Sequence, residues 1–83
     1  MAFRYHPVIL EELAQFGVFP TSETRPAMVH EFISDLYRFE LRRLRERLVR
    51  GDIAKARYSA EVVELRRRYP LVSIRAALWA ESD

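Results

Sequence analysis

The stretch from Pro26 to Arg50 constrains the fold more than any other part of the chain. It begins at a proline, which suits the first turn of a helix because the missing amide would be unpaired there, and contains no further proline and no glycine before Gly51. At about 1.5 Å per residue, a helix over 26–50 would be roughly 37 Å long. The sequence therefore predicts one long central helix against which shorter segments pack.

The apolar residues of this central helix change face about half-way along it. In the first half they follow the helical spacing i, i+3, i+4, i+7, at Val29, Phe32, Ile33 and Leu36. In the second half they follow steps of four, three and four, at Tyr37, Leu41, Leu44 and Leu48. At about 100° per residue the second stripe is displaced by about a quarter turn from the first. Two faces on one helix predict two different partner segments within the chain.

Shorter helices are predicted on either side of the central one. Residues 7–16 have Pro7 in the first turn, and Gly17 supplies the positive φ that a helix end favours. A third helix is expected over 54–69, because it follows a Gly51-Asp52 turn and Pro70 cannot continue it. Its apolar residues repeat the four, three, four spacing at Tyr58, Val62, Leu65 and Tyr69. Matched stripes across a short turn predict that 26–50 and 54–69 form an antiparallel helical hairpin.

The C-terminal segment 71–83 has an ambiguous pattern, in which residues 71–74 could be extended, but a short helix is favoured after them. Ser73 is a suitable N-cap for a helix over 74–80, and that helix would keep Leu71 and Trp79 from lying in an exposed apolar strip. The predicted fold class is all-α: a small bundle of three helices plus a short C-terminal helix, organised on the central helix. At this length one domain over 1–83 is expected.

Composition argues against several classes of function. The chain has no Cys, so disulfides and cysteine-based zinc sites are excluded. Its two histidines, His6 and His30, are not at metal-ligand spacing, and its two glycines are too few for a phosphate-binding loop. We expect no catalytic, cofactor or metal site, and therefore no enzyme. No apolar run approaches the roughly 20 residues of a membrane span, so the expected location is the cytoplasm.

Charge is distributed unevenly along the chain. Residues 1–37 hold two Arg against five acids, whereas 38–75 hold eleven Arg and one Lys against five acids. Helical spacing gathers candidates for a partner or nucleic-acid face, which are Arg38, Arg42, Arg45, Arg66, Arg67 and Arg68. Such a face can track phosphates or bind an acidic protein. The alternatives are a solvated face held by local pairs such as Glu46–Arg50, and an arginine content set by a GC-rich coding sequence.

A core of this size is expected to supply only roughly 3–5 kcal/mol, and self-association is the natural supplement. The candidates for an apolar interface are Phe39, Ala56, Ala60, Val63 and Trp79. The leading hypothesis is a non-enzymatic helical module for protein interaction or oligomerisation, as a homo-oligomer or with another protein. The alternative is a nucleic-acid-binding accessory protein that uses the Arg-rich helical face.

Overall fold

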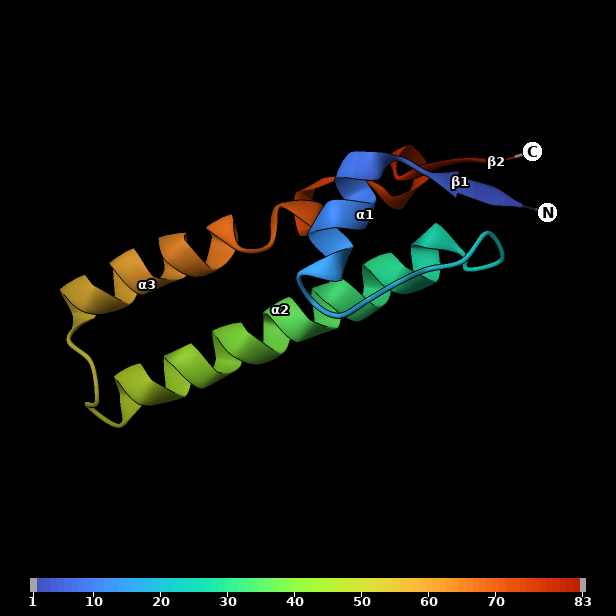
Figure 1. Cartoon of the computed structure of the whole chain (residues 1–83). Coiled ribbons are helices and arrows are strands. Elements are labelled where there is room, and N and C mark those ends of the chain that lie inside the picture. The colour runs from blue at the N-terminus through green and yellow to red at the C-terminus, as the bar shows by residue number, and fades with distance from the viewer. Residues whose placement is uncertain (1, 83) are drawn as a thin grey trace.

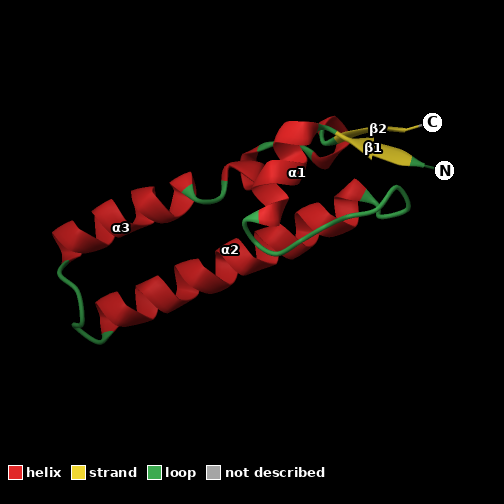
Figure 2. Cartoon of the chain, viewed as in Figure 1, coloured by secondary structure: helices red, strands yellow, loops and turns green. Residues whose placement is uncertain are grey.

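Three α-helices carry most of the chain in the structure, a computed structural model that describes residues 2–82 (Figure 1). They are α1 (Pro7–Ala14), α2 (Pro26–Val49) and α3 (Lys55–Arg67). Two 3₁₀ turns follow, η1 (Pro70–Ser73) and η2 (Ala76–Leu78). Two short strands, β1 (Phe3–Tyr5) and β2 (Ala80–Ser82), pair at the ends of the chain (Figure 2). The protein is thus mostly helical, with a small two-stranded sheet.

The predicted central helix is confirmed to within one residue. α2 spans 24 residues from Pro26 to Val49, and Arg50 forms its C-cap. Gly51 follows with a φ of +80°, a left-handed value that favours glycine. Two backbone hydrogen bonds close the turn. The Gly51 amide donates to the Leu48 carbonyl at 3.0 Å, and the Asp52 amide donates to the Arg47 carbonyl at 2.8 Å. These bonds satisfy carbonyl groups that the helix end would otherwise leave unpaired.

The two shorter helices have the predicted type and slightly tighter bounds. α1 ends at Ala14, two residues before the predicted end, and Gly17 closes it at a φ of +72°. The Val18 amide donates to the Leu13 carbonyl at 3.1 Å across this turn. α3 ends at Arg67, ahead of Pro70. Both helices thus end where the sequence places the residues that stop a helix.

The helices form an elongated molecule whose extents are 51 × 19 × 17 Å. α1, the sheet and the C-terminal turns lie at one end, beside the first half of α2 (Figure 1). α3 returns beside the second half of α2 after the turn at Gly51, and these two helices form an arm away from the termini. No helix within residues 2–82 is long and apolar enough to cross a membrane.

The core lies where α1 and the C-terminal segment meet α2. Its buried side chains come from every helix and from the C-terminal turns: Ile9, Leu13, Val29, Ile33, Leu65, Tyr69, Leu71 and Trp79. Tyr69 packs between two rings, with centroids 4.8 Å from Phe16 and 5.3 Å from Tyr37. Toward the tip of the arm Leu44 is the one further buried apolar side chain among the described residues. Most of the hydrophobic stabilisation is therefore concentrated at one end of the molecule.

The predicted C-terminal helix over 74–80 is wrong. Ile74 is extended, with φ −102° and ψ 119°, and it separates η1 from η2. The extended residue lets Leu71 and Trp79 both become fully buried, while the Trp79 Nε1–H donates to the Ile74 carbonyl at 3.0 Å.

The two-stranded sheet is absent from the sequence-based prediction. β1 and β2 run antiparallel, with Phe3 opposite Ser82 and Tyr5 opposite Ala80. The His6 amide extends the pairing by donating to the Trp79 carbonyl at 3.0 Å. The sheet thus ties the N-terminal segment to the segment that carries the buried tryptophan.

Candidate interaction surface

Four large apolar side chains of α2 remain exposed. The exposed fractions are 63% for Met28, 51% for Phe32, 51% for Phe39 and 78% for Val49. Three charged residues lie between these apolar residues, so that consecutive members of the row are alternately four and three residues apart. The whole row consists of Met28, Phe32, Asp35, Phe39, Arg42, Glu46 and Val49. At about 100° per residue it spans a sector of about 100°. We call this row the outer stripe of α2.

The outer stripe points away from both surfaces that α2 buries. Leu44, which is buried in the arm, lies about 140° around the helix from Phe39. Phe32, which the sequence pattern assigns to the core stripe, is instead half exposed, because its neighbour Ile33 takes the buried position. The 4-3 spacing of the outer stripe is visible in the sequence. The predicted interface nevertheless lacks Met28, Phe32 and Val49, because an equally regular stripe beside them predicts the core.

Charged side chains along this face are only partly paired. The Arg38 guanidinium lies 2.5 Å from the Asp35 carboxylate and 3.9 Å from that of Glu31. Arg43 extends over the Phe39 ring, with 5.9 Å between its guanidinium carbon and the ring centroid. Within residues 2–82, Arg42 makes no ion pair. A cation and an unburied aromatic ring thus lie side by side on one surface.

The six candidate arginines do not form one surface. Arg38 and Arg42 lie about 120° and 160° around α2 from Leu44, so they face away from α3, whereas Arg45 lies at the side of α2, about 100° from Leu44. Arg67 points away from α2 on the opposite side of the arm, since it lies about 160° around α3 from the buried Leu65. Arg67 pairs with Glu64 at 3.6 Å. Arg66 lies at the side of α3, and Arg68 faces α2.

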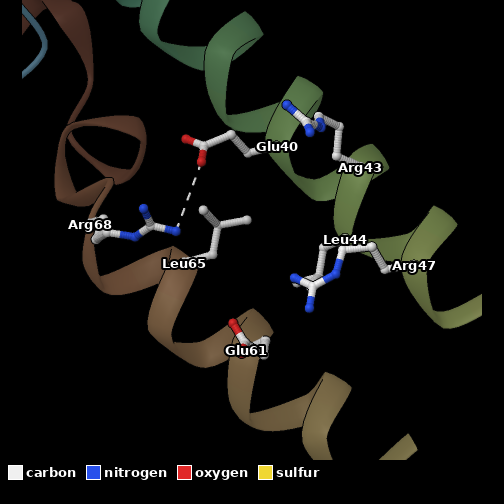
Figure 3. Close-up of a pocket in the computed structure, with 7 residues that line it drawn as sticks. All are labelled: Glu40, Arg43, Leu44, Arg47, Glu61, Leu65 and Arg68. Carbon is white, nitrogen blue, oxygen red and sulfur yellow. Dashed lines mark ion pairs between the residues drawn. The ribbon is translucent and has the colours of Figure 1, made fainter. Parts of the chain in front are cut away.

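Arg68 belongs to a groove between α2 and α3 (Figure 3). The groove has a volume of about 200 Å³ and is lined by Glu40, Arg43, Leu44, Arg47, Glu61, Leu65 and Arg68. The Arg68 guanidinium lies 3.8 Å from the Glu40 carboxylate, as the dashed line in Figure 3 shows. Glu61 pairs with Arg57 at 3.5 Å. Both acids of the groove are therefore held in ion pairs that join or brace the helices.

The Glu40 carboxylate also accepts a hydrogen bond from the Tyr69 hydroxyl. Burial, followed by this hydrogen bond and the negative charge of Glu40, raises the pKa of Tyr69 to about 12. The phenol is therefore neutral at physiological pH and acts as a donor. Tyr69 links the core to the groove, because its ring packs in the core while its hydroxyl reaches Glu40.

The candidate apolar residues divide into three cases. Phe39 is exposed on the outer stripe. Ala56, Ala60 and Val63 are exposed on the side of α3 that faces away from α2, and the C-terminal segment does not cover them. Trp79, in contrast, is 0% exposed and cannot be an interface residue. It is buried because the 3₁₀ turns and β2 bring it against α2, where its ring lies 5.2 Å from that of His30.

Residues 2–82 contain no cluster of three or more His, Cys, Asp or Glu side chains that could hold a metal ion. His30 is occupied by packing against Trp79 and by a 3.4 Å contact between its Nδ1 and the Ser34 hydroxyl.

Comparisons with protein-family models, with curated proteins and with solved structures find no match to this chain. The class that the structure defines is a small, mostly helical protein with a two-stranded sheet. The outer stripe of α2 carries four of the nine large apolar side chains that are exposed among the described residues.

Proposed function

We propose that this chain is a non-enzymatic helical module whose function is protein association, and that it associates with a second copy of itself through α2. The observation that carries the proposal is the outer stripe, where four large apolar side chains are at least half exposed along one helix. Burying about 100 Å² of a half-exposed Phe would gain about 2.5 kcal/mol, at about 25 cal/mol per Å². Such a row is a larger driving force than singly scattered surface apolar residues provide.

The arm formed by α2 and α3 supports this proposal. We propose that it acts as an antiparallel hairpin that holds α2 straight and presents its outer stripe. Leu44 and Leu65 are buried, and the Glu40–Arg68 pair joins the two helices beside them. Because α3 covers the opposite side of the second half of α2, it leaves the outer stripe available there. A rigid helix face loses little conformational entropy on binding.

Sedimentation equilibrium tests the proposal at chain concentrations between about 5 and 500 μM. We expect a reversible monomer–dimer equilibrium, with a dissociation constant on the order of micromolar to tens of micromolar because a single helix face is a small interface. Phe39→Asp should weaken the dimer by more than about tenfold. Phe19→Asp is the matched control, because Phe19 is 75% exposed but lies outside α2. A wild-type chain that stays monomeric at 500 μM would refute self-association.

A nucleic-acid-binding function is a second candidate, favoured by unpaired arginines. Within the described chain, Arg42, Arg45 and Arg66 make no ion pair. Fluorescence anisotropy with a labelled DNA duplex at several salt concentrations tests this candidate. Phosphate contact predicts an affinity that falls steeply with salt, and a slope reduced by about one for each arginine replaced by alanine. A salt-independent signal, or none near physiological salt, excludes it.

A further inference from the structure

We infer that two copies of this chain pair through antiparallel α2 helices, with the two-fold axis near Phe39. The inference rests on the proposed self-association and adds its geometry. A two-fold axis makes the interface self-complementary, so each contact occurs twice. The outer stripe must therefore match itself when its direction is reversed, and it does so at Asp35 with Arg42, at Met28 with Val49 and at Phe39 with itself.

The charge of α2 changes sign along its length. Residues 26–37 contain Glu31 and Asp35 and no cation, whereas 38–49 contain five Arg against two Glu. Antiparallel pairing lays the acidic half of each α2 on the basic half of the other. Parallel pairing would lay Asp35 on Asp35 and Arg42 on Arg42, and like charges at an interface cost free energy. The charge pattern therefore selects the antiparallel direction.

The register follows from matching individual positions. With the axis near Phe39, residues whose numbers add to about 77 lie opposite each other. Asp35 then faces the partner's Arg42, and Glu31 lies among the partner's Arg45, Glu46 and Arg47, which are two cations and one acid. Arg42 and Arg45 make no ion pair within the described part of one chain. Asp35 already contacts Arg38 at 2.5 Å, and a carboxylate can accept from a second guanidinium as well.

Apolar side chains match in the same register. The two Phe39 rings meet at the axis, each flanked by the Arg43 that extends over it. Met28 lies opposite the partner's Val49 at both ends of the contact. The side chains of Met28, Phe39 and Val49 are at least half exposed in the single chain. The alignment that pairs Asp35 with Arg42 therefore also covers this apolar surface. Phe32 is the exception, because it lies opposite the partner's Glu46 in this register.

The exposed side of α3 fits a second copy less well. Ala56 and Ala60 offer little area, and Val63 is the one large apolar side chain exposed on α3. Contact through α3 is therefore an alternative outcome of the experiments and not the inference.

Cross-linking through introduced cysteines tests the direction directly, because the natural chain contains no cysteine. Met28→Cys and Val49→Cys leave Phe39 intact. In the antiparallel dimer, two copies of either residue lie roughly 30 Å apart, since about 20 residues separate the position from its symmetry mate at 1.5 Å each. With a thiol cross-linker of about 10 Å, we expect covalent dimers when the two variants are mixed and none from either variant alone.

Each other outcome overturns the inference in a recognisable way. Cross-linking of each variant with itself would show parallel pairing. A dimer in sedimentation that yields no cross-link in any mixture would place the contact elsewhere, such as on α3, and would leave the proposed function standing. A monomer at all concentrations would remove both the proposed function and the inference.

Charge reversal tests the register. Asp35→Arg and Arg42→Asp should each raise the dimer dissociation constant by about tenfold, because each change creates two like-charged contacts. The double variant restores opposite charges and should return to within about threefold of the wild type. Glu11→Arg, an exposed change on α1, is the control. Thermal unfolding of the monomers would report the loss of the Asp35–Arg38 pair separately. A double variant as weak as the two single effects combined would overturn the register.

Discussion

Replacing Trp79 with alanine should destabilise the fold without acting on association. Trp79 is 0% exposed, and truncation of a fully buried Trp costs about 3–5 kcal/mol. A chain of this length is expected to have roughly 4–12 kcal/mol of stability in all. The variant would therefore be close to unfolded at the lower end of that range. The loss would extend to β2, because the Trp79 carbonyl accepts the His6 amide beside the sheet.

A second variant at this position removes the hydrogen bond but only part of the packing. Trp79→Phe keeps most of the ring but removes the Nε1–H that donates to the Ile74 carbonyl. Leaving a buried acceptor unpaired costs about 1–3 kcal/mol, so this variant should fall between wild type and Trp79→Ala. Phe19→Ala, on a side chain 75% exposed, should change stability by less than about 0.5 kcal/mol.

Urea unfolding followed by far-ultraviolet circular dichroism measures all three variants, since the signal does not depend on the tryptophan. In a thermal scan followed by the same signal, the loss in Trp79→Ala should lower the melting temperature by more than about 12 °C for a chain of this size. A cost below about 1 kcal/mol would contradict the buried position. An unchanged stability with a weakened dimer would instead return Trp79 to the interface assigned from the sequence.

Changes at three further positions test other parts of the fold. The raised pKa of Tyr69, about 12 against 10.0 for a free phenol, means that its stabilising contribution is complete below about pH 10 and lost as pH rises from 10 through 12. Wild type should therefore lose up to about 2–3 kcal/mol more than Tyr69→Phe over that interval in urea unfolding. Gly51→Ala should cost about 1 kcal/mol from its positive φ alone, because an added Cβ meets no atom within 4 Å, and Gly51→Asn should cost less in the same thermal scan. Leu65→Ala should cost about 2–5 kcal/mol, since Leu65 is 2% exposed where α3 meets the core. An effect below 1 kcal/mol would show that α3 is only loosely attached.

Local signals account for the parts of the fold that the sequence predicts well. Pro26 and Gly51 set the limits of α2, because a proline suits a first turn and a glycine accepts a left-handed φ at no steric cost. Gly17 and Pro70 act in the same way for α1 and α3. These residues restrict the backbone whatever surrounds them, so each helix was found with its end within about two residues.

Spacing alone did not decide which face of a helix is buried. Phe32 and Ile33 are neighbours, and either could belong to a helical stripe through Val29. Only the position of α1 and the C-terminal turns buries Ile33 and leaves Phe32 on the outer stripe. The arginines show the same effect, since regular spacing on two helices says nothing about the direction in which each helix faces.

Pairing between distant segments was decided by the tertiary structure alone. β1 and β2 meet across most of the chain, with Tyr5 opposite Ala80, and strands of three residues carry almost no periodic signal of their own. The extended Ile74 between two 3₁₀ turns has the same origin, because burial of Leu71 and Trp79 outweighs the local preference for a helix. The limits of a helix are set by backbone sterics within a few residues, and the prolines and glycines that impose them can be read from the sequence. Burial is set by contacts between segments far apart along the chain, which exist only once the chain has folded.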